Sequence, residues 1–226
     1  MIADLVPDGV HACEAFGDAG PESAVELFPA EEAVVAGVFD ERRKEFTTVR
    51  GCARTALARL GETPEPLVPG PMGAPGWPAG VVGSMTHCRG YRAAAVAHAA
   101  GFAAIGIDAE PQEPLPGVVA ARAVTDAERR LLRQDFPAAA ELPLDRLVFC
   151  AKEASYKAFS AWLGTRFGFR DFTVRLRADG TFRCVPPGVA MPRSPRCAEG
   201  FPGRWAARSG LVLTVVVLAA HADAEF

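Results

Sequence analysis

The sequence lacks a positive excess of charge. Its 226 residues include 24 Lys and Arg against 27 Asp and Glu, which gives a net charge of −3. Binding to a nucleic-acid backbone asks for a strong positive excess, so nucleic acid is not expected as a partner. Only local basic clusters are left as sites for phosphate groups.

Long apolar runs and a leader peptide are missing too. The longest apolar run, 211–220, is too short to span a bilayer, and its Val and Thr residues predict a buried strand. Residues 1–7 have no basic start and are interrupted by Asp4 and Pro7, so no secretory signal is expected. The six cysteines form no Cys-x-x-Cys pair, which is typical of reduced thiols. We therefore expect a cytoplasmic protein without a membrane partner.

Half of the residues are hydrophobic and 23% are charged, a globular composition. Helical spacing of apolar residues over 31–60 is followed by strand patterns, and helical patterns after the proline-rich stretch 111–117 are again followed by strands. This order predicts an α+β protein of two parts joined at 111–117. The predicted strands are 10–16, 81–84, 91–96, 102–107 (running on into 105–110), 172–176, 181–185, 203–208 and 211–218, and the later helices are 118–124, 125–136 and 146–162.

Local signals mark three positions. Thr125-Asp-Ala-Glu128 is a capping box, which predicts the start of a helix. Asp145 is expected to cap the helix that follows. His87 is expected just beyond the end of a short strand, where its side chain could face a ligand.

The predicted helix 146–162 carries charges beside a stripe of small residues. At about 100° per residue, one face is predicted to be buried and to admit a close neighbour. Glu153 and Lys157 stand four residues apart on another face. They are either an ordinary ion pair on a solvated helix or a carboxylate and an ammonium of a site. The face predicted to be buried consists of Leu147, Ala151, Ala154, Ala158 and Trp162.

A second acidic pair lies at the end of the strand pattern 102–110. Alternation along the strand sends Asp108 and Glu110 to the same side. Together with Glu153 they offer three carboxylates, enough to bind Mg²⁺ and to leave positions for phosphate and water. Lys152 and Lys157 would add positive charge, and Glu153 could take a proton from an attacking hydroxyl. Arg42, Arg43 and Arg50 are further candidate phosphate ligands.

These residues also match a known family. Gly106-Ile-Asp-Ala-Glu110, followed about forty residues later by Phe149-Cys-Ala-Lys-Glu-Ala-Ser-Tyr-Lys157, resembles the paired signature of the long, surfactin-synthetase-activating 4′-phosphopantetheinyl transferases. Gly83-Ser-Met-Thr-His-Cys88 and Arg42-Arg-Lys-Glu-Phe-Thr-Thr-Val-Arg50 resemble two further stretches of actinobacterial and enterobactin-type members. The resemblance covers residues 40–160 and continues at 203–205 and 211–214.

The resemblance implies a monomeric pseudo-dimer of two similar α+β halves with the active site in the cleft between them. Residues 1–112 would contact the 3′-phosphate of coenzyme A and supply part of the metal site. Residues 113–226 would carry the Lys-Glu-x-x-x-Lys helix and dock the carrier protein. The partners would be coenzyme A and apo acyl or peptidyl carrier proteins of polyketide, nonribosomal peptide or fatty acid synthesis.

In the implied reaction, the serine hydroxyl of the carrier attacks the β-phosphate of coenzyme A, accepts phosphopantetheine and expels 3′,5′-ADP. The implied catalytic residues are Glu153, Lys157 and Asp108, with Glu153 or a water on Glu110 as the base. Mg²⁺, or Mn²⁺ in its place, would be bound by Asp108, Glu110 and Glu153. The implied coenzyme A ligands are Arg42, Arg50, Thr86, His87, Lys152 and Lys157.

One departure and two alternatives stand beside this interpretation. Met72 occupies a loop where similar sequences tend to have a basic residue, which puts one coenzyme contact in doubt. A metal-dependent nuclease would also combine Asp108, Glu153 and a lysine, although the negative net charge speaks against it. A non-catalytic protein that binds coenzyme A or carrier proteins would not need a base beside its metal.

Overall fold

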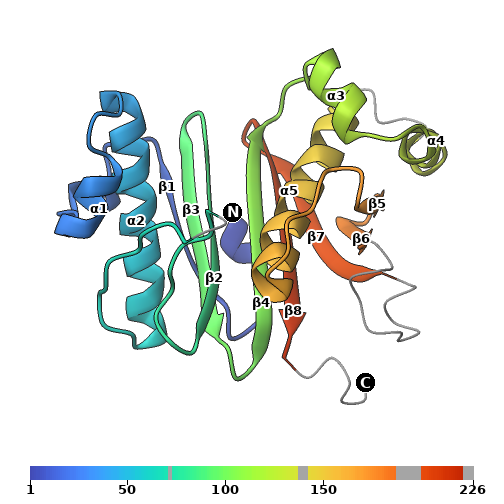
Figure 1. Ribbon diagram of the computed structural model, residues 1–226. Coiled ribbons are helices and arrows are strands. Elements are labelled where there is room, and N and C mark those ends of the chain that lie inside the picture. The colour runs from blue at the N-terminus through green and yellow to red at the C-terminus, as the bar shows by residue number, and fades with distance from the viewer. Residues whose placement is uncertain (71–72, 137–141, 187–199, 221–226) are drawn as a thin grey trace. The chain divides into compact units, whose positions relative to one another are not determined.

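The computed structural model describes residues 1–70, 73–136, 142–186 and 200–220. The chain forms two compact units: Met1–Ile105 with the end of the chain from Leu218, and Gly106–Val217. Five α-helices and two sheets lie in the described residues, so the predicted α+β class is confirmed (Figure 1). Among these residues, no helix is long and apolar enough to cross a membrane.

The first unit is a three-stranded antiparallel sheet with a long helix packed on it (Figure 1). The strand order is β1-β3-β2, and Cys13 of β1 faces Ala94 of β3 in the register. The elements are η1 (Ile2–Asp4), β1 (His11–Phe16), η2 (Pro21–Ala24), α1 (Pro29–Val34), α2 (Asp40–Leu60), β2 (Val81–Cys88) and β3 (Tyr91–His98).

Helix α2 follows from its three- and four-residue apolar spacing. Its buried face packs on the sheet in a core that includes Cys52, Ala56 and Leu57, and the helix ends at Gly61 with a φ of 89°. A β-carbon on Gly51 would lie 2.0 Å from the carbonyl oxygen of Glu22, so only glycine lets η2 lie directly on α2.

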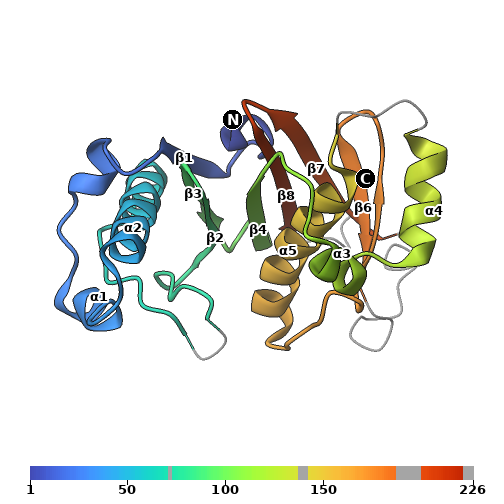
Figure 2. The same cartoon turned by 90° about the horizontal axis from the view of Figure 1, so that it is seen from above.

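The second unit contains most of a five-stranded sheet with the order β4-β8-β7-β6-β5, and its long helix α5 lies along one face (Figure 2). The pairs β5–β6, β6–β7 and β7–β8 are antiparallel. The elements are β4 (Phe102–Pro111), in which the boundary between the units falls, α3 (Gly117–Ala123), α4 (Asp126–Asp135), α5 (Leu144–Leu163), β5 (Thr173–Leu176), β6 (Thr181–Val185), β7 (Phe201–Arg208) and β8 (Leu211–Ala219).

The small residues of α5 let the helix approach β4 closely. A β-carbon on Gly106 would lie 1.8 Å from the carbonyl oxygen of Ala154, which leaves no room for any side chain at position 106. Ala151, Ala154 and Ala158 are fully buried, as the helical stripe predicts, whereas Trp162 at its end is 38% exposed. This contact fixes α5 against the strand that carries Asp108 and Glu110.

The capping box at Thr125 is confirmed: the Glu128 amide donates to Thr125 Oγ1 over 3.2 Å, and the Thr125 amide donates back to the Glu128 carboxylate. The predicted cap at Asp145 is wrong, because α5 begins at Leu144 and the Asp145 carboxylate binds Arg129 instead. The predicted position of His87 beyond the end of the strand is also wrong. A two-residue turn at 89–90 continues the pairing of β2 with β3 to Cys88, so His87 lies inside β2 opposite Arg92.

Candidate active site

Lys157 joins α5 to β4. Its Nζ atom lies 2.7 Å from Asp108 Oδ1 and donates to the Ile107 carbonyl over 3.0 Å. The Lys157 side chain is 27% exposed, and that of Asp108 only 7%. The alternative of an ordinary Glu153–Lys157 pair on a solvated helix is therefore wrong, because the ion-pair partner of Lys157 is a buried carboxylate on a neighbouring strand.

Arg146, in the first turn of α5, also joins this helix to an acidic residue of β4. Its guanidinium donates to Glu110 Oε2 over 2.7 Å and to the carbonyls of Glu113 and Pro114. Arg146, Glu153 and Lys157 follow one another at seven and four residues, so they share one face of the helix. Each of the two acidic residues of β4 is thus held by a cation from α5.

Glu153 lies between these two cations on α5, and its carboxylate forms no hydrogen bond or ion pair with any other described residue. It borders a cavity of about 180 Å³. The cavity is mostly aromatic, and Phe169 also packs against Phe149 at 5.2 Å between ring centroids. The lining residues are Lys152, Glu153, Tyr156, Phe167, Gly168, Phe169 and Phe172.

Burial and neighbouring negative charge raise the pKa of two carboxylic acids of this region, Glu110 and Glu153. Burial, and then the negative charge of Asp108, raise the pKa of Glu110 and of Glu153 above the ordinary value, and Arg146 and Lys157 offset only part of that effect. Burial alone would lower the pKa of Lys157, but the charge of Asp108 and its hydrogen bond raise it. At neutral pH Lys157 is therefore a cation, and the acidic residues repel one another.

A divalent metal fits this donor set by its chemistry. Asp108, Glu110 and Glu153 offer hard oxygen atoms, and a bound cation would remove the repulsion that raises the pKa of the two glutamates. Over the part of the chain that the structure describes, no three His, Cys, Asp or Glu side chains are gathered at ligand distances. Metal binding would thus require Asp108 and Glu110 to turn from Lys157 and Arg146, whereas the Glu153 carboxylate has no such cation to leave among the described residues.

Lys152, a sequence candidate for a phosphate ligand, lies in the interior. Its ammonium is 2.9 Å from the Glu128 carboxylate and 2.7 Å from the Ala123 carbonyl. Both side chains of the ion pair are fully buried. The structure therefore does not bring the Lys152 ammonium to the face of α5 that carries Glu153 and Lys157.

The candidate coenzyme ligands of the first unit fall into an exposed pair and a buried pair. Arg42 Nη1 lies 2.6 Å from His87 Nε2, and the Glu45 carboxylate contacts Arg42, His87 and Arg92. Arg42 and His87 are accessible to an anion from solvent, with side chains 49% and 37% exposed. Glu45, which the motif contains but which sequence reasoning did not single out, neutralises part of the charge of Arg42 and Arg92.

Arg50 and Thr86 are buried. The Arg50 guanidinium donates to the Leu67 carbonyl and lies 3.4 Å from the centre of the Phe46 ring. Burial lowers the pKa of Arg50 to about 10, which still leaves it charged at neutral pH. Because Arg50 is buried, a phosphate group bound at the surface of the first unit would not contact its guanidinium directly.

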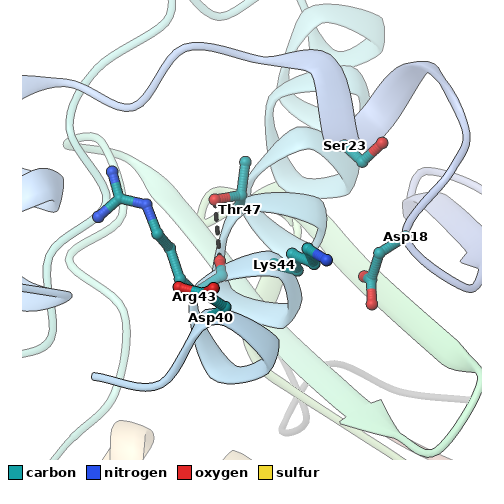
Figure 3. A pocket seen from close by; sticks show the side chains of 6 residues that line it. All are labelled: Asp18, Ser23, Asp40, Arg43, Lys44 and Thr47. Atoms are coloured by element: carbon teal, nitrogen blue, oxygen red, sulfur yellow. Dashed lines mark hydrogen bonds between the residues drawn. The ribbon is translucent and has the colours of Figure 1, made fainter.

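Arg43, the third candidate arginine, belongs to a different face of α2. It ion-pairs with Glu32 and lines a cavity of about 370 Å³. Figure 3 shows Arg43 and Lys44 leaving the helix in opposite directions, and two acidic residues balance their charge. This cavity is not a basic phosphate site. Its lining residues are Asp18, Ser23, Asp40, Arg43, Lys44 and Thr47.

Sequence reasoning missed Arg146, Glu128 and the aromatic residues 167, 169 and 172. Arg146 had a usable signal, since it lies seven residues before Glu153 on the same helical face. The run Phe167-Gly-Phe-Arg-Asp-Phe172 also concentrates aromatic residues directly after α5. No signal in the sequence indicated a further role of Glu128, because the capping box already accounts for a glutamate at this position.

Comparison with known proteins identifies relatives along the whole chain. The family described as 4′-phosphopantetheinyl transferase N-terminal domain matches residues 30–97, and the 4′-phosphopantetheinyl transferase superfamily matches residues 104–216.

Individual relatives agree with the family match. The chain is 47% identical to the 4′-phosphopantetheinyl transferase Svp of Streptomyces mobaraensis, covering 98% of this chain and 91% of Svp. It is 42% identical to the 4′-phosphopantetheinyl transferase Npt of Nocardia iowensis, covering 97% and 100%. It is 38% identical to the 4′-phosphopantetheinyl transferase PptT of Mycobacterium tuberculosis, covering 96% and 98%.

Proposed function

The chain belongs to the 4′-phosphopantetheinyl transferase superfamily, and we propose that α5 and β4 of its second unit supply the catalytic residues. It is a transferase that moves the phosphopantetheine group of coenzyme A to a carrier protein. The relatives support neither the metal-dependent nuclease nor the non-catalytic binding protein.

Glu153 is the general base of the proposed mechanism. A base must be able to accept a proton, and the Glu153 carboxylate has no hydrogen-bond donor among the described residues. Its raised pKa also makes it a better proton acceptor than an ordinary carboxylate when it is ionised. The carrier serine would donate its hydroxyl proton to Glu153 as its oxygen attacks the β-phosphate. This free carboxylate beside an aromatic cavity is the observation that carries the proposal.

The aromatic cavity suits the apolar part of the pantetheine arm. Phe167, Phe169 and Phe172 offer apolar surface next to Glu153. An arm held there would place the reacting phosphate near the carboxylate. Tyr156 on the same rim could hydrogen-bond an amide of the arm.

Lys157 and Asp108 form the electrostatic part of the site. Lys157 is held on Asp108 and is partly exposed, so its ammonium can also turn to a phosphate oxygen and stabilise charge that develops during transfer. Asp108 orients Lys157 and, with Glu110 and Glu153, would hold Mg²⁺ or Mn²⁺. When bound, such an ion neutralises charge on the pyrophosphate of coenzyme A.

The first unit contributes coenzyme ligands in this proposal. Arg42 and His87 are the exposed pair and would meet a phosphate group directly. Arg50 and Thr86 would support the phosphate site from below the surface. The halves 1–112 and 113–226 are proposed as the coenzyme-phosphate half and the carrier-docking half.

Carrier proteins are acidic around their reactive serine, so exposed arginines of the second unit are proposed to dock them. Arg122 and Arg133 are exposed, whereas Arg129 is partly occupied by Asp145 and the Ala120 carbonyl. A monomeric state, a cytoplasmic location and independence from membranes and nucleic acids belong to the same proposal. The carriers would be acyl or peptidyl carrier proteins.

Transfer to purified apo carrier proteins tests the proposal. Wild-type protein with coenzyme A and Mg²⁺ should add phosphopantetheine to the carrier serine and release 3′,5′-ADP, both measured by mass spectrometry. A carrier whose serine is replaced by alanine is the control and should stay unmodified. Binding of coenzyme A without modification of any apo carrier in a panel would contradict the proposed chemistry.

A further inference from the structure

The second unit contains a fully buried ion pair that the proposed mechanism does not use. Lys152 Nζ lies 2.9 Å from Glu128 Oε2, and neither side chain is exposed to solvent. Removing two charges from water is costly, and an apolar pair of similar size often stabilises a fold as well. A pair like this one is therefore poorly explained by stability alone.

The Glu128 carboxylate collects four hydrogen-bond donors. Lys152 Nζ and the amide and hydroxyl groups of Thr125 donate to Oε2, and the Val174 amide donates to Oε1 over 2.9 Å. Lys152 also donates to the carbonyl of Ala123 at the end of α3. One ion pair thus connects α3, the start of α4 and β5 to a single position on α5.

That position lies directly next to Glu153. Lys152 and Glu153 both line the aromatic cavity, and so does Phe172, which lies two residues before Val174. Glu128 binds the Val174 amide, and Val174 follows the cavity-lining Phe172 closely in the chain. The ion pair therefore connects this wall of the cavity to α5, the helix that carries the proposed base. Because the pair is charged and has directional hydrogen bonds, it specifies one geometry where apolar packing would tolerate several.

We propose that the Lys152–Glu128 pair is a positioning device that holds Glu153 and the cavity wall in register for transfer, and that Lys152 is not a coenzyme ligand. This inference rests on the proposed function of Glu153. To reach a phosphate, Lys152 would have to leave Glu128 behind as a buried carboxylate without its cation, which is strongly unfavourable. If Lys152 were a phosphate ligand instead, its removal would weaken coenzyme binding, which is the opposite of what a positioning role predicts.

Three variants distinguish these roles. Lys152→Met keeps the length of the side chain without the charge, and Glu128→Gln keeps the shape of the carboxylate. The double variant Lys152→Met/Glu128→Gln leaves no buried charge unpaired. For each we would measure the dissociation constant of coenzyme A by calorimetry, kcat and KM for transfer, and the melting temperature.

Positioning predicts a split between binding and turnover. Lys152→Met should lower kcat about tenfold or more while the dissociation constant of coenzyme A changes by less than about threefold. The double variant should recover stability, because the unpaired charge is gone, but only part of the kcat, because directional hydrogen bonds are lost.

Three results would overturn the proposal. Coenzyme affinity that falls about tenfold in Lys152→Met and no less in the double variant would identify a phosphate ligand. A double variant with wild-type kcat would make the pair dispensable for positioning. If no variant folds, the pair is a stability element alone.

A matched control connects two of the same elements. Arg175 of β5 pairs with Asp135 of α4 at 3.1 Å, but there the Arg175 side chain is 53% exposed. The variant Arg175→Met/Asp135→Asn should leave kcat, KM and coenzyme affinity unchanged. Absence of transfer by the wild-type protein would contradict the proposed function itself, whereas this inference is judged by ratios between variants and an active wild type.

Discussion

Lys157 Nζ on α5 lies 2.7 Å from Asp108 Oδ1 on β4, which joins the helix of the proposed base to the strand of the proposed metal ligands. The same carboxylate that orients Lys157 raises the pKa of Glu110 and Glu153. Asp108 is therefore the shared electrostatic partner of the other three residues, and changes at Asp108 should affect all of them.

We expect Asp108→Ala and Glu110→Ala each to abolish magnesium-dependent turnover. Each substitution removes one of few protein oxygen atoms from a metal that must also contact the pyrophosphate. The measurement is the transfer rate as a function of Mg²⁺ concentration. Asp145→Ala removes a carboxylate of α5 that binds Arg129, and it serves as a control with unchanged magnesium dependence. Wild-type rates in either test variant at limiting Mg²⁺ would remove the metal assignment.

Glu153→Gln should reduce turnover far more than coenzyme binding. The amide keeps the shape of the side chain but cannot accept the serine proton, so we expect a loss of about 10²–10⁴-fold in kcat at saturating Mg²⁺. Calorimetry on the same variant should give a coenzyme affinity close to that of the wild type. If affinity collapses and turnover at saturation is normal, Glu153 is only a binding residue.

Metal and pH should act together on stability. Glu110 and Glu153 have folded-state pKa values above the ordinary 4.5, so the folded chain holds more protons than the unfolded chain just above that pH. Their contribution to the free energy of unfolding therefore falls as pH rises through this window. Bound Mg²⁺ offsets the repulsion, and its effect on Tm should be larger at about pH 7.5 than at about pH 5. A Glu110→Gln/Glu153→Gln variant that keeps the wild-type difference would contradict this.

Much of the fold was accessible from periodicity and local signals. The alanine stripe of α5 predicted its buried face, and alternation along β4 predicted that Asp108 and Glu110 share a side. These patterns work because each element buries one face, whatever its partner is. The predicted end of β2 was wrong because the strand continues as far as it pairs with β3, and pairing depends on both strands together.

The partners of the charged residues could not be predicted in the same way. Helical spacing predicted Glu153 as the partner of Lys157. In the structure, Lys157 instead binds the buried carboxylate of Asp108, which lies on a neighbouring strand. Lys152 and Glu153 are neighbours in sequence and both line the aromatic cavity, but the Lys152 ammonium binds Glu128, whereas the Glu153 carboxylate binds no described residue. Periodicity says which face a residue occupies, and only tertiary packing says what it meets there.

Charge reversal of the proposed docking arginines should weaken carrier recognition. We expect Arg122→Glu, Arg129→Glu and Arg133→Glu to slow association with apo carrier protein and to flatten its dependence on salt, because each removes an attraction to an acidic surface. Arg129→Glu also breaks the pair with Asp145, so its melting temperature must be measured beside its kinetics. The docking proposal fails if all three variants keep the wild-type carrier affinity and salt response.

The last prediction concerns Met72, which lies outside the described residues. The family resemblance places its loop near the 3′-phosphate of coenzyme A, with Arg42, Arg50 and His87 as the other partners. In the structure, Glu45 contacts both Arg42 and His87, and Arg50 is buried under the surface. A doubly charged phosphate would therefore be under-neutralised in this chain, which has no basic residue at position 72.

Met72→Lys should restore the missing charge. One partly exposed ion contact contributes on the order of 0.5–1 kcal/mol after solvent screening, which is a few-fold gain in coenzyme affinity. The gain should shrink as salt increases, because exposed charges are screened. It should also vanish for 3′-dephospho-coenzyme A, since the new ammonium would have no target. Calorimetry with both coenzymes separates this direct contact from a general change in loop order, which would tighten both equally. Equal tightening, or no gain at low ionic strength, would show that the loop does not touch the 3′-phosphate.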